Sequence, residues 1–217
     1  MRAILAATVA LACTIGLWAA PQRPTHGRLF PPEDLGILES PDRVDWQQPD
    51  RIMDALLIAD GSRVADLGAG GGWFTIRLAR RVGPNGVVYA VDIQTQMLES
   101  IRRRVADQGS QDRVQPVLAT ADDDPSLPEN LDAVLIVDTY PQFNDPVTVL
   151  RHVARSLAPN GRVGIVDFKL DGAGGPGPPL DERLDPAVIL RDAHEAGLRY
   201  LHEETFLRYQ YLLVFGR

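Results

Sequence analysis

Cysteine and lysine are nearly absent from this 217-residue chain, and histidine is scarce. Cys13 is the only cysteine, and it lies in a segment that we expect to be a leader, so the domain that follows has no thiol chemistry and no disulfide. Lys169 is the only lysine, which we interpret as compositional bias. The four histidines have no spacing, among themselves or with acids, that is typical of a metal site. We therefore expect no bound metal.

An excess of positive charge is also missing. The formal net charge is −7, and an acidic domain binds nucleic acid poorly. Arg102–Arg104 is the only basic cluster, and we interpret it as the solvated face of a helix rather than an RNA contact. We therefore expect no nucleic-acid partner.

Residues 1–20 contain one positive residue, Arg2, and then a long apolar run, and a proline-rich segment follows them. This pattern is typical of a signal peptide or a membrane anchor. About 17 apolar residues are marginal for spanning a bilayer at about 1.5 Å per residue. A lipoprotein site at Ala12-Cys13 and a buried N-terminal helix are the alternatives.

The leader predicts an exported (periplasmic) or membrane-anchored protein, with membrane association through residues 4–20. The cytoplasmic-facing anchor stays open, because Arg2 precedes the apolar run while Arg23 and Arg28 follow it, which leaves the positive-inside rule nearly balanced.

The rest of the chain has the composition of one globular domain, with 45% apolar and 24% charged residues overall. We expect a linker or N-terminal cap at residues 21–45 and a single domain at residues 46–217. The hydrophobic pattern predicts helices at residues 46–59, 73–82, 94–107, 145–157 and 184–196. It predicts strands at residues 62–67, 86–92, 113–119, 131–137 and 161–168, and a closing hairpin at 198–206 and 209–215. This order predicts an α/β fold, a Rossmann-like three-layer sandwich with a seven-stranded, mostly parallel sheet whose last strand is antiparallel.

The most specific motif is the run from Asp66 to Gly72, which reads D-x-G-x-G-x-G between a predicted strand and a predicted helix. Glycines allow a sharp turn and a close approach to a ligand. A dinucleotide fingerprint, G-x-G-x-x-G, would need a third glycine at position 73, which is Trp73. The motif therefore indicates a nucleotide-binding turn of another kind, with a glycine-rich turn that binds nothing as the alternative.

A second acid, Asp92, ends the next predicted strand, 24 residues after Gly68. A carboxylate at this strand end can accept hydrogen bonds from two ribose hydroxyls. Asp92 alone does not separate one adenosine cofactor from another, and it can also cap the helix that begins near Thr95.

The motif from Asp66 to Gly72 resembles motif I of the class I S-adenosylmethionine-dependent methyltransferases. The likeness extends over roughly residues 45–217 and is strongest to the group of ubiquinone/menaquinone-biosynthesis C-methyltransferases. The segments that match are Val64–Thr75, Val88–Asp92, Asp123–Pro128, Leu131–Tyr140 and Leu157–Asp167. The resemblance implies the same seven-stranded fold and S-adenosyl-L-methionine as the cofactor.

The resemblance also implies roles for individual residues. Asp66 would hold the methionine part of the cofactor, Asp92 its ribose, and Ile93 would pack on the adenine. The turn formed by Gly68, Ala69, Gly70 and Gly72 would pass beneath the amino-acid and ribose portions. Asp123, with Asp122 as second choice, would accept a hydrogen bond from the adenine amino group; an ordinary acidic loop is the alternative.

The end of the fourth predicted strand would face the methyl group and the acceptor. We take Asp138 and Tyr140 as candidate catalytic residues, which would remove a proton where the acceptor must lose one. Relatives carry histidines just after this tyrosine, whereas Pro141 and Gln142 stand here. Asp167 ends the fifth strand, where a capping or loop-tying role is as well supported as a role in the site.

Two residues before the domain, Arg43 and Trp46, are candidates for a lid over the site, with plain packing as the alternative for Trp46. The chain is thus expected to be a methyltransferase that acts on a small-molecule or lipid-like acceptor, of open oligomeric state. A non-catalytic domain that binds S-adenosylmethionine is the first alternative, and an NAD-linked oxidoreductase is the second.

Overall fold

The computed structural model describes residues 29–120, 123–171 and 175–217. The expected leader and Asp122 lie outside the described residues. Within the described part of the chain, no helix is both long enough and apolar enough to cross a membrane.

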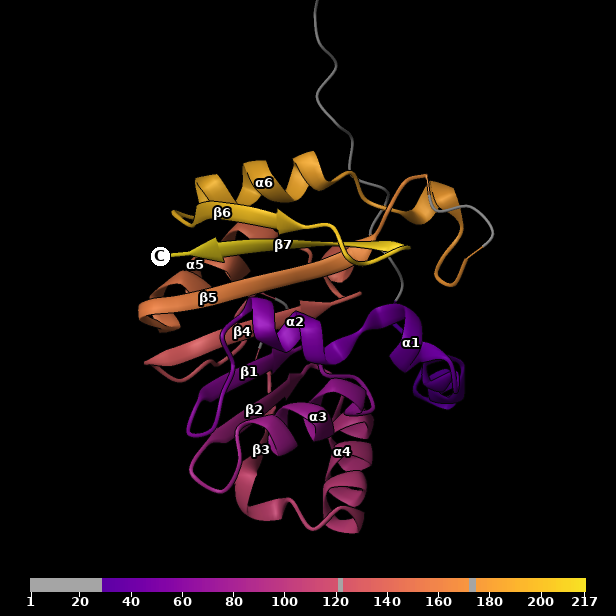
Figure 1. Cartoon of the computed structure of the whole chain (residues 1–217), viewed down its shortest axis with the longest axis vertical. Helices are drawn as coiled ribbons and strands as arrows, with labels where there is room; N and C mark the ends of the chain where they lie inside the picture. The colour runs from indigo at the N-terminus through magenta and orange to yellow at the C-terminus, as the bar shows by residue number, and fades with distance from the viewer. Residues whose placement is uncertain (1–28, 121–122, 172–174) are drawn as a thin grey trace, which may run out of the picture.

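A single seven-stranded sheet runs through the molecule in the order β3-β2-β1-β4-β5-β7-β6 (Figure 1). The strands are β1 (Arg63–Leu67), β2 (Val87–Asp92), β3 (Val114–Leu118), β4 (Leu131–Val137), β5 (Leu157–Phe168), β6 (Arg199–Glu204) and β7 (Gln210–Gly216). The pairs among β1 to β5 are parallel, and β7 runs antiparallel to both β5 and β6. The predicted sheet, with its reversed last strand, is confirmed.

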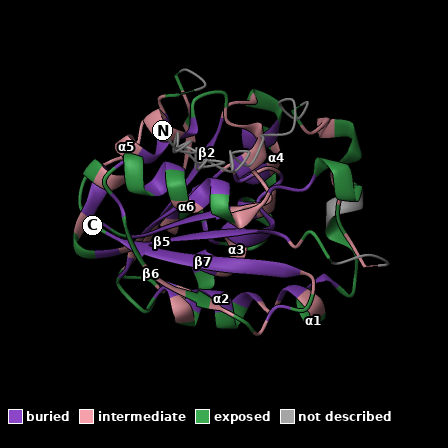
Figure 2. Cartoon of the chain, turned by 90° about the horizontal axis from the view of Figure 1, so that it is seen from above, coloured by how far each residue is buried: buried purple, intermediate pink, exposed green. Residues whose placement is uncertain are grey.

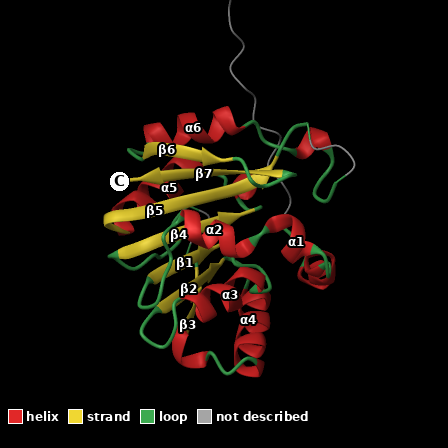
Figure 3. Ribbon diagram, in the orientation of Figure 1, coloured by secondary structure: helices red, strands yellow, loops and turns green. Residues whose placement is uncertain are grey.

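Helices cover both faces of the sheet and complete three layers (Figure 3). One hydrophobic cluster joins the sheet to α2 (Pro49–Ala55), α3 (Trp73–Arg81) and α4 (Thr95–Asp107). A second cluster joins the opposite face to α5 (Pro146–Ser156) and α6 (Pro186–Glu195). Both faces of the sheet are therefore buried, which explains the continuous apolar sequence of its inner strands.

Strand β4 illustrates this pattern. Ala133 and Leu135 belong to the first cluster, while Val134 and Ile136 belong to the second, and all four are fully buried. Strand β7 is buried along its whole length (Figure 2), because β6 pairs with its outer edge and its apolar side chains belong to the two hydrophobic clusters.

Two helices on the second face begin with the same dipeptide, Asp-Pro. The Asp145 side chain accepts a hydrogen bond from the backbone N–H of Thr148 at the start of α5, and Asp185 accepts one from Ala187 at the start of α6. Aspartate satisfies a free N–H of the first turn, and proline at the first helical position lacks the N–H that would otherwise need a partner.

The N-terminal part of the domain differs from the prediction. The single helix predicted at residues 46–59 is two short helices, α1 (Arg43–Gln47) and α2, because Gln48 takes the left-handed conformation (φ 47°) between them. Part of the expected linker is a 3-10 helix, η1 (Pro32–Glu39). Segments this short do not show a helical repeat in the sequence, so the pattern could not reveal them. The remaining 3-10 turns are η2 (Gln111–Arg113), η3 (Tyr140–Gln142) and η4 (Leu180–Glu182).

We expect Gly164→Ala to destabilise the fold, because a Cβ at this position of β5 would lie 2.8 Å from the Cδ1 atom of the buried Leu56. Overpacking of this kind costs about 1–3 kcal/mol. Urea unfolding should show a lower midpoint with an unchanged slope. Gly36→Ala is the matched control, since a Cβ there meets no atom of residues 29–120, 123–171 and 175–217 within 4 Å. Equal midpoints for the two variants would contradict the packing of Leu56, the residue after α2, against β5.

Candidate functional site

A cavity of about 270 Å³ opens at the carboxyl ends of β1, β2 and β4. Strand β1 pairs with β2 on one side and β4 on the other, so the connections leaving β1 and β4 diverge to opposite faces. This strand-order reversal is where open parallel sheets bind ligands. The apolar part of the lining comes from Leu29, Phe30, Leu35, Leu67, Ala69, Trp73, Phe74, Val91, Ile93, Met97, Ala119, Pro125, Val137, Phe143 and Val149.

The glycine turn after β1 is packed on one side and open on the other. A Cβ on Gly68 (φ +77°) would lie 2.2 Å from Thr139 Cγ2, and the Thr139 hydroxyl donates a hydrogen bond to the Gly68 carbonyl (3.2 Å). At Gly70 (φ +52°), no atom of the described residues lies within 4 Å of the Cβ position. Gly68 therefore allows the two loops to meet, and Gly70 leaves backbone exposed to the cavity.

Asp66 lies at the start of this turn and lines the cavity. Its side chain is buried, and Oδ2 accepts a hydrogen bond from the Thr75 hydroxyl (2.6 Å) on α3. Burial raises the pKa of Asp66 to about 6, and the hydrogen bond from Thr75 partly opposes that rise.

Asp92 also lines the cavity and shapes the turn. Its Oδ2 accepts a hydrogen bond from the Gly70 N–H (2.9 Å), and its Oδ1 accepts one from the Gln94 N–H (2.9 Å). Burial raises its pKa, against these backbone hydrogen bonds. Each oxygen of a carboxylate has two lone pairs, so these bonds leave acceptor capacity for two hydroxyls. The contact with Gln94 is also relevant to the capping alternative. Asp92 accepts the N–H of Gln94, the residue before α4, so it helps to fix the start of that helix. Ile93, the next residue, is half-buried against the same cavity.

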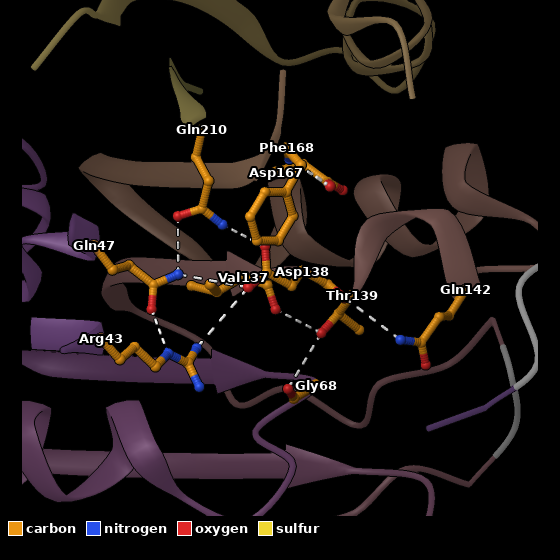
Figure 4. A network of polar contacts seen from close by, with 10 residues as sticks. All are labelled: Arg43, Gln47, Gly68, Val137, Asp138, Thr139, Gln142, Asp167, Phe168 and Gln210. Atoms are coloured by element: carbon orange, nitrogen blue, oxygen red, sulfur yellow. Dashed lines mark hydrogen bonds and ion pairs between the residues drawn. The ribbon is translucent and has the colours of Figure 1, made fainter. Parts of the chain in front are cut away.

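Asp138 follows β4 in the left-handed conformation (φ 55°) and faces the cavity floor. Its Oδ1 accepts a hydrogen bond from Gln210 Nε2 (2.6 Å), and its Oδ2 accepts a longer one from Gln47 Nε2 (3.5 Å; Figure 4). The Arg43 guanidinium lies 3.9 Å from Oδ2. Burial raises the pKa of Asp138 to about 6, and Arg43 and the two amides oppose the rise.

Tyr140, Asp123 and Gly72 are not among the described residues that line the cavity. Tyr140 is buried, and its hydroxyl donates to Asp192 Oδ2 (3.0 Å) on α6, so its contacts favour a role in packing α6. Asp123 is exposed. A role in the site for any of the three residues stays a prediction.

Asp167, at the end of β5, is buried, and its Oδ1 accepts a hydrogen bond from the Phe168 N–H (2.7 Å). Its Oδ2 is the buried side-chain polar atom that has no hydrogen-bond partner among the described residues. Burial raises the pKa of Asp167 to about 8, and the nearby charge of Asp138 contributes to the rise.

Sequence reasoning missed Gln47 and Gln210, because single glutamines on a helix and a strand belong to no motif. Arg43 was expected as part of a lid, and it does line the cavity, with its guanidinium carbon 4.2 Å from the centre of the Trp73 ring. Trp46 instead packs against Phe168 and Tyr209, with ring centres 6.1 and 6.4 Å away.

The charges around the cavity fit S-adenosylmethionine. The charged lining residues within the described ranges are four carboxylates and one guanidinium: Glu39, Asp66, Asp92, Asp138 and Arg43. A ligand with a sulfonium and an ammonium group but a single carboxylate complements this balance, whereas a pyrophosphate would meet mostly negative charge. The open backbone at Gly70 leaves room beside these acids.

Comparisons with known proteins agree with this geometry. A family model described as a methyltransferase domain matches residues 64–161. The chain is 33% identical over 108 residues to the ubiquinone/menaquinone biosynthesis C-methyltransferase UbiE of Hahella chejuensis, a match that covers 50% of this chain and 43% of that protein. It is 37% identical over 119 residues to an uncharacterized methyltransferase of Mycobacterium bovis, with 54% and 44% covered. The aligned regions therefore span less than half the length of these relatives.

A solved structure extends the likeness to nearly the whole domain. A SAM-dependent methyltransferase from Aquifex aeolicus superposes with a TM-score of 0.79 at 25% identity, covering 86% of this chain and 98% of that one.

We expect Asp167→Asn to remove a pH-dependent loss of stability. Asp167 has a pKa of about 8 in the folded protein and near 4 when unfolded, so folding binds a proton between these values and stability falls as the pH rises through them. When the pH moves from about 5.5 to about 8.5, the free energy of unfolding of the asparagine variant should rise relative to that of wild type, by on the order of 3 kcal/mol at most. Urea unfolding at both pH values measures this. A constant difference between the two proteins would show that Asp167 does not titrate in this way.

We expect Asp92→Ala to weaken the binding of S-adenosylmethionine by about 1.5–3 kcal/mol, because a charged acceptor is lost. Isothermal titration calorimetry measures the affinity, and Asp112→Ala, an exposed acid in η2, is the control. Thermal unfolding of both variants separates loss of the acceptor from loosening of the turn that Asp92 holds. Unchanged affinity in Asp92→Ala would remove its assignment to the ribose.

Proposed function

The chain belongs to the class I S-adenosylmethionine-dependent methyltransferases, and from this we propose that it transfers a methyl group from S-adenosylmethionine to a small or lipophilic acceptor. The observation that carries the proposal is the cavity at the strand-order reversal, where Asp66 and Asp92 flank an open glycine turn. The same acidic lining disfavours the pyrophosphate of NAD, and so disfavours the oxidoreductase alternative.

The residues that would hold the cofactor are those of the turn and the two strand ends. Asp66 would face its methionine part, Asp92 its ribose hydroxyls and Ile93 its adenine. When bound, the cofactor supplies a methyl group already activated by the positive charge on sulfur. The protein then needs mainly to align the acceptor and to exclude water.

Asp138 is the candidate base of the reaction. It lies on the cavity floor, and its carboxylate is about a quarter exposed, so an acceptor can reach it. A pKa of about 6 leaves this carboxylate mostly ionised at neutral pH and able to take a proton from an acceptor hydroxyl, amine or activated carbon. We assign this role to Asp138 rather than Tyr140, whose hydroxyl is bonded to Asp192.

The acceptor is proposed to be lipophilic because the N-terminal segment contributes apolar side chains to the cavity. Leu29, Phe30 and Leu35 come from this segment, and Leu35 lies against the Cβ position of Gly71, 3.0 Å away. Phe143 adds a ring from the loop after β4. The name of the Hahella relative places that protein in quinone biosynthesis, which supports an acceptor of this class. The apolar run at residues 4–20 supports placement at a membrane, with the side of the membrane open.

We expect transfer of labelled methyl groups from S-adenosylmethionine to a component of a membrane lipid extract, with Asp138→Asn slowed at least tenfold if the acceptor must lose a proton. Activity should fall as the pH drops below about 6, because the base must be ionised. Tyr140→Phe is the control and should keep its rate. Calorimetry with S-adenosylmethionine and with NAD accompanies the assay. Binding without transfer to any acceptor would favour the non-catalytic alternative, and binding of NAD alone would overturn the proposal.

A further inference from the structure

A chain of hydrogen bonds links two residues of the cavity lining, Arg43 and Asp138, and joins three elements that are far apart in sequence. It starts at Arg43 on α1, passes through Gln47 on the same helix and Gln210 on β7, and ends at Asp138 after β4 (Figure 4). Gln47 and Gln210 are 0% and 1% exposed, so their amides depend on these partners.

The hydrogen bonds in this network all point in one direction, from donor to acceptor. A guanidinium can only donate, so Arg43 Nε, 2.6 Å away, requires the oxygen of the Gln47 amide. The Gln47 nitrogen then faces Gln210 Oε1 (3.0 Å), which turns the Gln210 nitrogen toward Asp138 Oδ1 (2.6 Å). Flipping either amide would bring two donors or two acceptors together in a buried place, which is unfavourable.

Each of the three side chains in this hydrogen-bond network therefore presents a donor toward Asp138. Gln210 donates to Oδ1, Gln47 to Oδ2 at 3.5 Å, and Arg43 lies 3.9 Å from Oδ2. An ionised carboxylate accepts all of these, whereas a protonated one would set its own O–H against them.

We propose that Gln47 and Gln210 are positioning residues that hold Asp138 ionised and oriented at the cavity floor, with Arg43 fixing the direction of the chain. The inference rests on the proposed function only where Asp138 takes a proton from the acceptor. The effect on the charge of Asp138 does not depend on catalysis.

Asp138 is faced by charged and titratable groups from several elements. Arg43 on α1 favours its ionised form, whereas Asp167 on β5 and Tyr211 on β7 are coupled to it by charge. Asp66 on β1 acts on Arg43. Burial raises the pKa of Asp138, and the two amides oppose this, so loss of an amide donor should raise the pKa further.

The test is a carboxyl-carbon NMR titration of protein labelled in its aspartates, with Asp138 assigned from the Asp138→Asn spectrum. Gln210→Met keeps the side-chain length but removes the donor, and it should raise the pKa of Asp138 by about one to two units. Gln210→Glu replaces the donor with a second carboxylate and should raise it further. Gln47→Met loses the longer hydrogen bond to Asp138 and should therefore raise its pKa by less. This variant provides the test if the Gln210 variants do not fold. Gln115→Met, at an exposed position of β3, is the control.

The kinetic readout separates positioning from packing. In Gln210→Met the acid limb of the kcat profile should move to higher pH by the same amount as the pKa, while KM for S-adenosylmethionine stays within about twofold of wild type. A pKa of Asp138 unchanged in Gln210→Met and Gln47→Met overturns the inference, even if the protein binds the cofactor and methylates an acceptor. Absence of cofactor binding together with the expected pKa rise would instead overturn the proposed function and leave the inference standing.

Discussion

The missing side chain of Gly68 is the constraint on which the site depends. A Cβ there would collide with Thr139, so only glycine allows the turn after β1 to lie against the loop after β4. This contact occurs where the strand order reverses, and it brings the ends of two neighbouring strands together. Asp66 and Asp138 thereby line one cavity, although 71 residues separate Gly68 from Thr139.

Burial of acids at this edge of the sheet follows from the fold. Strands covered on both faces carry their last residues into a place with little water, so a carboxylate there must be matched by donors or become protonated. The three acids meet this condition differently: Asp66 has the Thr75 hydroxyl, Asp92 has two backbone N–H groups, and Asp138 has side-chain amides. Since Asp92 also holds the N–H of Gly70, the acid that would bind a ribose is one that shapes the glycine turn.

The sequence predicted the parts of the fold that repeat over several residues or belong to a motif. The sheet, its reversed last strand and the cavity residues from Asp66 to Ile93 were within reach because apolar runs and the spaced glycines are local signals. The break at Gln48 was missed because a left-handed residue other than glycine has no clear sequence mark. Gln47 and Gln210 were missed for another reason: they bond to each other across 163 residues, and nothing in either neighbourhood indicates the other.

The ends of β4 and β5 show how one edge of a sheet can give two aspartates different charges. Asp138 receives donors from two elements and lies near a guanidinium, whereas Asp167 receives one backbone N–H and its other oxygen has no partner in the described part of the chain. Burial raises the pKa of both acids; Arg43 and the two amides oppose the rise at Asp138, whereas the charge of Asp138 adds to the rise at Asp167. Two neighbouring carboxylates do not easily ionise together, and the one that receives more donors holds the negative charge more readily. The uneven distribution of donors between the two acids thus favours the ionised form of Asp138, which is the form that its proposed role as a base requires.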